Sequence, residues 1–266
     1  MANFDVNNFA IDRILRGLMT SSKDGSLMWS VNQVTDPSLS ITSDTSEVTD
    51  AIGSTIASFN RAKKAEFSAN NSLFDMSLLA AQQGNDKIVA TTEEKIVTPA
   101  FETLTVPKTN TSPVVLKHEP IVQPTEIYQL KGDGTLGEKL VYSATTGAGK
   151  FTYDDSTHAI TFPTASVAGD EYFIQYEYEA TRAVSVTGDA INFPKAGKFI
   201  MEVLGTDVCD QSTLIHAYII FPNAKLDANV DISFATDGNH PFKLIAQQAY
   251  CDSKKTLFQI VIPDEE

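Results

Sequence analysis

Apolar and polar residues alternate one by one over long stretches of this chain, which is the pattern of a β-strand with one buried face. In the clearest case, every second position is a tyrosine or isoleucine: Tyr172, Ile174, Tyr176 and Tyr178. The residues between them are mostly Glu and Gln, so this strand is expected to turn a polar side to solvent. Strands need paired neighbours, and the pattern therefore predicts a mostly β protein.

Two further strand signals lie in the first quarter of the chain. Asp24-Gly25 separates two part-apolar runs, residues 13–20 and 26–34, which is typical of a β-hairpin. The helical spacing of residues 11, 14, 15 and 18 supports a helix instead, but Trp29 follows without a helix stop, so we prefer the hairpin. Residues 55–69 alternate from Ala57 to Phe67 and are predicted to form one long strand.

The stretch between these strands, residues 38–54, is rich in Ser, Thr and Asp and has few apolar anchors. It predicts short strands and an extended loop with little core of its own. One helix is expected after residue 70, with Asn71 or Ser72 as its N-cap and Gly84 as its stop. Its predicted buried stripe has four members: Leu73, Met76, Leu79 and Ala80.

The second half of the chain indicates an inserted domain. After a linker-like segment at 105–113, short strand pairs at 127–130 with 140–142 and 151–153 with 160–162 predict an Ig-like β-sandwich over 113–182. More strands follow, at 199–204, 214–221, 230–234, 244–250 and 257–262. We therefore expect residues 1–112 and 183–266 to form one discontinuous β domain, with residues 113–182 inserted into it.

Composition limits the function classes. The net charge of −14 is spread along all 266 residues rather than held in a tail, which disfavours ordinary binding to a phosphate backbone. No secretion signal or membrane-spanning run is evident, so we expect synthesis in a cytoplasm and no membrane partner. The two cysteines, Cys209 and Cys251, allow one disulfide, although two buried thiols are the more ordinary arrangement.

No motif indicates catalysis. The segment 146–150 (Thr-Gly-Ala-Gly-Lys) is similar to a phosphate-binding loop, but Phe151 replaces the required hydroxyl and Ala144 the leading glycine, so a flexible hairpin loop is expected. The four histidines lack the spacing of zinc ligands: His118, His158, His216 and His240. No nucleophile elbow is present. We therefore expect no enzyme activity, no cofactor and no metal site.

Two segments carry a family resemblance. They are residues 59–74, FNRAKKAEFSANNSLF, and residues 221–242, from Phe-Pro-Asn-Ala-Lys to His-Pro-Phe. They resemble the tail tube (major tail) proteins of bacteriophages, over the outer blocks and not the central insert. The resemblance implies a tail-tube-like β-sandwich or barrel with one flanking α-helix, and Ig-like insertions are common in such proteins.

The resemblance also implies a function. Such proteins are structural virion proteins that self-assemble into stacked, usually hexameric rings, and these form the tail tube through which DNA passes without specific binding. The implied partners are further copies of the chain, a tape-measure protein inside the tube, and sheath, tail-terminator or baseplate proteins. The implied location is the virion tail. The alternative is an Ig-like adhesion or decoration protein of a virion or cell surface.

Two expectations concern particular residues. Some acidic side chains of the outer blocks are expected to face the lumen, because a wall without cationic sites does not hold passing DNA. The one dense basic cluster, Arg61, Lys63 and Lys64, is expected to make subunit contacts instead. Residues 38–54 and 55–69 are expected to supply the joints between rings, because their own core is weak.

Overall fold

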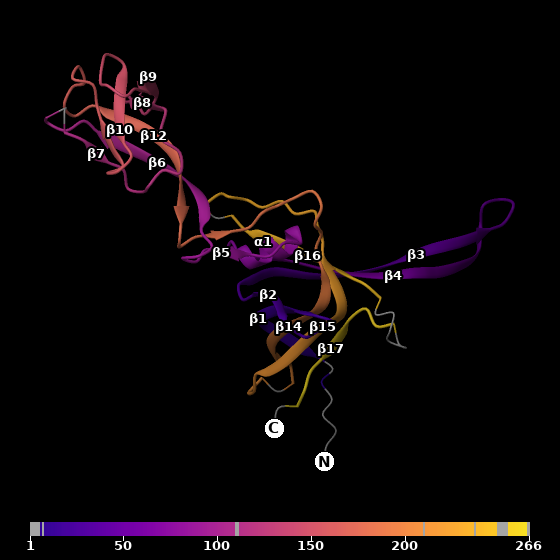
Figure 1. Ribbon diagram of the computed structural model, residues 1–266. Coiled ribbons are helices and arrows are strands. Elements are labelled where there is room, and N and C mark those ends of the chain that lie inside the picture. The colour runs from indigo at the N-terminus through magenta and orange to yellow at the C-terminus, as the bar shows by residue number, and fades with distance from the viewer. Residues whose placement is uncertain are drawn as a thin grey trace. The chain divides into compact units, whose positions relative to one another are not determined.

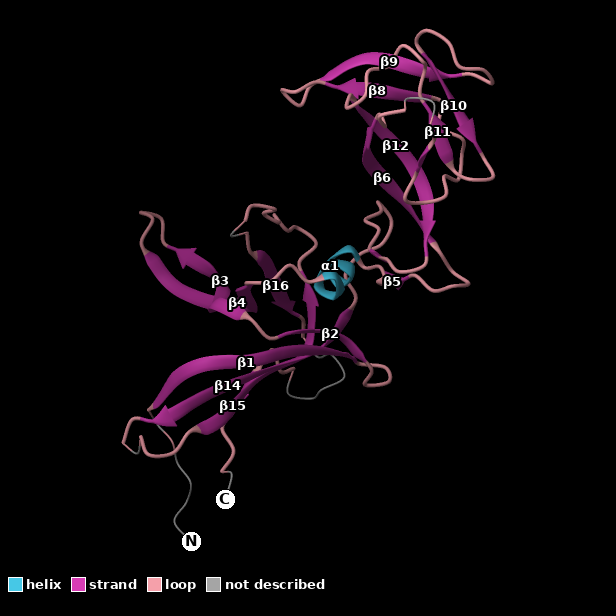
Figure 2. Ribbon diagram, turned by 90° about the vertical axis from the view of Figure 1, so that its left-hand side faces the viewer, coloured by secondary structure: helices cyan, strands magenta, loops and turns pink. Residues whose placement is uncertain are grey.

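The computed structural model describes residues 6, 8–109, 112–209, 211–236, 238–248 and 255–264. The chain divides into two compact units. Unit 1 comprises residues 1–87 and 186–266, and unit 2 comprises residues 88–185. The predicted fold class is confirmed, since the protein is mostly β with one helix (Figure 2).

Unit 1 is built on one antiparallel sheet (Figure 1). Its strands are β1 (Phe9–Ser21), β2 (Leu27–Val31), β3 (Val34–Thr49), β4 (Thr55–Asn71), β14 (Ala196–Asp207), β15 (Ile215–Leu226), β16 (His240–Ala246) and β17 (Gln259–Val261). The order is β2-β1-β14-β15-β16-β4-β3, and β17 pairs with β15. The outermost strands, β2 and β3, are consecutive in the chain, with only Asn32 and Gln33 between them. The sheet must therefore curl until its ends meet, which gives a nearly closed barrel.

Aromatic rings fill the interior of this curled sheet. Trp29 packs on Phe199 and Phe242 with ring centroids 5.5 and 5.8 Å apart, and Phe67 and Phe221 complete the cluster. All five side chains are buried. Space is tight here: a Cβ added at Gly17 would lie 2.9 Å from the Phe199 ring, so β1 needs glycine at this position.

The predicted hairpin at the N-terminus is confirmed, because β1 and β2 pair antiparallel around a turn with Gly25 at φ 72°. The helix alternative is wrong. The second arm is shorter than predicted and ends at Val31, because Val34 already begins β3.

Residues 38–54 do not form short strands and a loop, as the sequence predicted. β3 runs unbroken to Thr49 and pairs with β4 from Val34↔Asn71 to Thr49↔Thr55. Threonine has a high β-propensity, and backbone hydrogen bonds to β4 need no apolar side chain. The strand predicted at 230–234 is also wrong. The chain leaves the sheet at Asp227, whose carboxylate accepts from the Asn229 N–H at 3.0 Å.

The helix α1 (Met76–Gln83) begins later than predicted. Asp75 is the N-cap in place of Asn71 or Ser72, because its carboxylate accepts from the N–H groups of Ser77 and Leu78 at 2.7 and 2.9 Å. Leu73 therefore lies outside the helix. The buried residues are Leu78, Ala80 and Gln82, so only Ala80 of the predicted stripe is fully buried. The predicted stop at Gly84 is confirmed by its φ of 72°.

A buried polar network joins α1 to β16. The His240 ring is fully buried; its Nδ1 accepts from the Asp75 N–H at 3.2 Å and its Nε2 lies 2.9 Å from Gln82 Oε1. Gln82 in turn donates to the Pro241 carbonyl at 2.9 Å. These contacts fit a neutral imidazole that carries its proton on Nε2. The network fixes the helix to the start of β16.

Unit 2 contains β5 (Ile88–Val89), β6 (Ile96–Thr105), β7 (Val114–Val115), β8 (Glu126–Leu130), β9 (Leu136–Tyr142), β10 (Lys150–Asp154), β11 (Ala159–Thr161), β12 (Glu171–Ala180) and β13 (Val184–Ser185). Seven strands follow the order β6-β12-β8-β9-β10-β11-β7, and β5 pairs with β13. The predicted alternation in β12 is confirmed, since Tyr172, Ile174 and Tyr176 are buried. The Ig-like assignment stays a prediction.

The units divide at 87/88 and 185/186 rather than at the predicted 112/113 and 182/183. The difference arises because β6 pairs with β12 along its whole length, from Ile96↔Ala180 to Thr105↔Glu171. The predicted linker at 105–113 therefore lies within unit 2. The segment 146–150 leads into β10, which pairs in parallel with β9, so the predicted hairpin loop is wrong.

Burial lowers the pKa of His240, and the Asp75 carboxylate opposes this only in part. The unfolded chain then binds the proton more readily, so the free energy of unfolding should fall as pH drops below about 6.5. Urea unfolding at pH 7.5 and 5.5 measures this fall. His240→Gln should show a smaller pH dependence, whereas the exposed control His118→Gln should keep it. Equal pH dependence in H240Q and the unchanged protein would contradict the assignment.

Unit 1 should fold without unit 2. The ends of unit 2 are adjacent, because Val89 lies opposite Val184 in the β5–β13 pair. We expect that replacing residues 90–183 with Asn-Gly leaves unit 1 folded, since its core contains no residue of unit 2. The single tryptophan, Trp29, reports on that core. We expect a cooperative thermal transition and a fluorescence emission typical of a buried Trp29. Emission typical of an exposed tryptophan would contradict the prediction.

Candidate assembly interface

Strands β3 and β4 extend beyond the body of unit 1 as a two-stranded arm, which we define as residues 40–64 (Figure 1). Almost every side chain of the arm is exposed, whereas Ala65, Phe67 and Ala69 at its base are buried. The arm nevertheless carries five large apolar side chains, with exposed fractions of 47 to 87 %: Ile41, Val48, Ile52, Ile56 and Phe59. An isolated two-stranded ribbon is only marginally stable in water, so the arm is a candidate surface for a partner.

The arm also has open backbone edges. Among the described residues, β3 pairs only with β4. On its other side β4 pairs with β16 from Glu66 to Asn71, and no described strand continues this pairing toward Thr55. Unpaired N–H and C=O groups along such edges can accept a further strand.

The tip of the arm is an ordered turn. One carboxylate oxygen of Asp50 accepts from the N–H groups of Ile52 and Ser54 at 3.0 and 2.8 Å. Gly53 closes the turn with a φ of 87°. The turn holds the Ile52 side chain in solvent with an exposed fraction of 87 %. A rigid apolar tip of this kind is suited to insertion against another surface.

A β-bulge within the arm switches the faces of β4. Thr42 lies opposite Lys64 and Asp44 lies opposite Arg61, so two residues of β4 face a single residue of β3. Ala62, the first of those two, has a φ of 49°, a conformation that costs free energy for any residue with a Cβ.

Because of the bulge, β4 does not follow the predicted alternation along its whole length. Ala65 and Phe67 face the core, whereas Phe59 and Arg61 point to the opposite side, because the extra residue reverses the period of two. The prediction of one continuous side from Ala57 to Phe67 is therefore wrong.

The three predicted interface cations all lie on the arm and are exposed. Arg61 and Lys64 share one face, and Lys63 is in the bulge. The Lys64 Nζ lies 3.5 Å from an Asp44 carboxylate oxygen, and more than half of each side chain is exposed. Such a pair contributes little to folding. The role of these cations in subunit contacts stays a prediction.

A second surface lies on the sheet face opposite the core. Leu18, Ile200 and Ile220 stand directly opposite one another across β1, β14 and β15, and all three are half-buried. A strand that is apolar on both faces, as β15 is, is typical of a sheet covered on both sides. This apolar row is thus a second surface suited to a partner.

Sequence reasoning missed an exposed aromatic patch beside the helix. Phe74 and Phe234 pack together with ring centroids 5.6 Å apart and are 46 and 83 % exposed. Phe74 also stacks on His240 at 5.2 Å. The one sequence feature that could have indicated this patch is Phe234, an isolated aromatic residue in a segment rich in Ser and Asp. The sequence analysis predicted a strand there instead.

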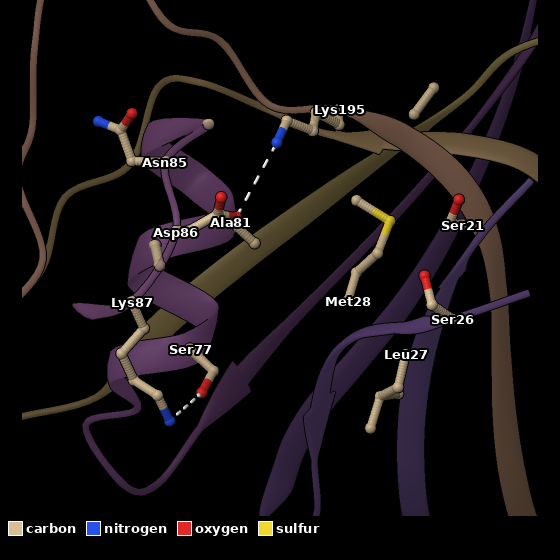
Figure 3. Close-up of a pocket in the computed structure, with 13 residues that line it drawn as sticks. Ser21, Ser26, Leu27, Met28, Ser77, Ala81, Asn85, Asp86, Lys87 and Lys195 are labelled. Atoms are coloured by element: carbon tan, nitrogen blue, oxygen red, sulfur yellow. Dashed lines mark hydrogen bonds and ion pairs between the residues drawn. The ribbon is translucent and has the colours of Figure 1, made fainter. Parts of the chain in front are cut away.

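A pocket of about 600 Å³ lies between α1 and the β1–β2 turn (Figure 3). Lys87 Nζ is 3.0 Å from Ser77 Oγ, and Lys195 Nζ is 3.9 Å from the Asp86 carboxylate. The Lys195 ammonium thus faces a carboxylate and the Lys87 ammonium a hydroxyl, and no lining residue is a histidine or cysteine.

The four histidines lie apart. His118 stacks on Tyr178, His158 contacts Tyr153 at 3.2 Å, His216 contacts Glu202 at 2.9 Å, and His240 belongs to the network described above. In the described part of the chain no group of three or more His, Cys, Asp or Glu could hold a metal ion. Cys209 is exposed rather than buried, and Cys251 lies outside the described residues.

The fold and these surfaces define a class of protein: in its described residues it is a β-structured protein with a curled sheet, one flanking helix and a long arm with open edges. Among the described residues no helix is long and apolar enough to cross a membrane. The sequence model of the YomU/Tube protein family matches residues 9–257, and the chain belongs to this family. The family points to a structural protein of the phage tube type, in the virion tail. No curated protein matches the chain.

The exposed cations provide a test of the arm. Arg61→Glu with Lys64→Glu should change the free energy of unfolding by no more than about 0.5 kcal/mol, because both side chains are in solvent. If the arm makes subunit contacts, the same variant should assemble less, as measured by sedimentation. The matched control is Lys131→Glu with Lys150→Glu, two exposed lysines of unit 2. Assembly reduced equally in both variants would show a general charge effect and contradict the assignment.

Proposed function

We propose that this chain is the subunit of a phage tail tube and that identical copies form rings, hexameric as in the proteins it resembles, which stack into a hollow channel for DNA. The observation that carries the proposal is the arm. Its apolar side chains and strand edges remain uncovered in the single chain, and both are satisfied when another copy packs against them.

The arm favours contacts between rings. A head-to-tail contact, in which different patches of two copies meet, generates an open filament rather than a closed pair. The arm and the body of unit 1 are such different patches, since one is a narrow ribbon and the other a curled sheet. Contacts within a ring then use other surfaces, of which the apolar row at Leu18, Ile200 and Ile220 is the best candidate.

The acidic charge fits passage of DNA. With a Debye length of about 8 Å at physiological ionic strength, carboxylates on a channel wall repel phosphates close to the wall and give them no site to bind. We propose that acidic residues of unit 1 line the lumen and that Arg61, Lys63 and Lys64 face neighbouring subunits. The protein acts as a scaffold rather than as an enzyme. Its further partners are a tape-measure protein within the lumen and terminator, baseplate or sheath proteins outside it.

Shortening the arm tests the ring-to-ring role. Thr45 lies opposite Asn60, so residues 46–59 can be replaced by Asn-Gly without changing the register of the rest. The removed segment contains no fully buried side chain, so the unfolding midpoint should stay within a few degrees of the original. Electron microscopy should then show single rings or short stacks in place of long tubes.

The unchanged chain, assembled at the same concentration, is the control and should form tubes. Long tubes from the shortened variant would refute the role of the arm. Monomers from the unchanged chain at every concentration would refute the tube subunit itself.

A further inference from the structure

The solvent-facing side of unit 2 carries a group of aromatic side chains that the core does not use. Phe101 on β6, Phe173 on β12 and Tyr128 on β8 lie on three adjacent strands (Figure 2). Phe173 stands directly opposite Tyr128, and the rings of Phe101 and Phe173 are 5.9 Å apart with an interplanar angle of only 15°. We call these three side chains the aromatic platform.

The platform has no packing role in unit 2. The buried cluster of this unit uses the alternate positions of the same strands, such as Ala100, Ile127 and Tyr172, and includes no platform residue. Phe101 is 64 % exposed, and Phe173 and Tyr128 are half-buried. Cross-strand aromatic pairing contributes at most about 1 kcal/mol to a sheet, and it does not require the most exposed ring to be phenylalanine.

Hydrogen-bonding groups surround the rings. Thr103 lies opposite Phe173, and Gln175 lies opposite Phe101. On the other side Tyr128 donates to Glu126 at 2.5 Å, and the Lys139 Nζ lies 3.0 Å from the second oxygen of that carboxylate. The platform is thus an exposed apolar surface with hydroxyl, amide, carboxylate and ammonium groups at its margin.

The charge of unit 2 restricts the ligand. Residues 88–185 contain 13 Asp and Glu against 7 Lys and Arg. This excess repels anionic polymers such as nucleic acids and acidic polysaccharides. A neutral ligand avoids this repulsion.

We propose that the aromatic platform binds a neutral carbohydrate chain. One face of a hexose ring presents C–H groups, which are apolar and slightly positive, and these stack on the negative face of an aromatic ring. The outward hydroxyls of the sugar both donate and accept hydrogen bonds, as the side chains at the margin do. Phe101, the most exposed of the three rings, is the one that such a sugar can reach most easily.

The proposal does not depend on the tube function, because it uses only residues of unit 2. It gives unit 2 a role of its own, the attachment of the protein to polysaccharide.

Affinity electrophoresis of the full chain tests the platform. Native gels containing dextran, yeast mannan or soluble galactan are compared with a gel without polysaccharide and with one containing alginate, which is anionic. We expect at least one neutral polysaccharide to retard the protein and alginate not to do so. Phe101→Ala should weaken the retardation at least about tenfold, whereas Phe101→Tyr should keep it.

The matched control is Val97→Ala, an exposed apolar residue on the same face of β6. It should be retarded as the unchanged chain is. Three results overturn the proposal: no retardation by any neutral polysaccharide, unchanged retardation of the F101A variant, or equal loss in the V97A variant. Concentration-dependent association that F101A abolishes, seen by sedimentation without polysaccharide, would assign the face to contacts between copies instead.

Discussion

Two residues, Asn32 and Gln33, connect the strands at opposite ends of the sheet of unit 1, and the rest of the unit depends on this short connection. Because β2 and β3 are sequence neighbours but lie at opposite ends of the strand order, the sheet has to curl. The Gln33 carbonyl accepts from the Ser72 N–H at 2.9 Å, which ties the connection to the end of β4. The curl brings Trp29, Phe67 and Phe242 from three separate strands into one cluster.

The same connection accounts for the arm. The β2–β3 junction and β16 fix the inner end of β4, so the hairpin must extend its remaining length away from the core. Two bulges near the base of the arm change the direction and the exposed face of the strands. One lies near Asp36, with a φ of 52°, and the other at Ala62. Beyond these bulges the arm has exposed edges, and Ile52 at its tip is exposed to solvent.

Sequence reasoning succeeded where one signal fixes the local structure. The alternation of β12 and the glycines at 25 and 84 predicted elements that the structure confirms, because a period of two or a positive φ allows few alternatives. It failed where the local structure depends on a neighbouring strand or on a residue far along the chain. β3 is a strand only because β4 lies beside it. The face of Arg61 depends on a bulge with no glycine to mark it, and the N-cap moved to Asp75 because His240, far along the chain, fixes that backbone N–H.

The candidate surfaces were harder to find for the same reason. Arg61, Lys63 and Lys64 stood out as a local cluster, but Leu18, Ile200 and Ile220 come together only through the register of three strands. Phe101, Phe173 and Tyr128 likewise require the β6-β12-β8 order. In the last two groups the sequence shows only ordinary apolar or aromatic residues in strands. Only the structure reveals that their face is not the buried one.

A subunit with open edges and exposed apolar side chains has to remain soluble until it assembles, and the charge pattern fits this need. The net charge of −14 makes random collisions between copies repulsive. The arm itself carries no net charge, because its three acidic residues, Asp44, Glu47 and Asp50, are balanced by Arg61, Lys63 and Lys64. Arg61 and Lys64 are close to the base of the arm. We propose that they contact the acidic body of another copy. A neutral arm meets less repulsion from an acidic body than two bodies meet from each other, which fits the arm-to-body contact that we propose.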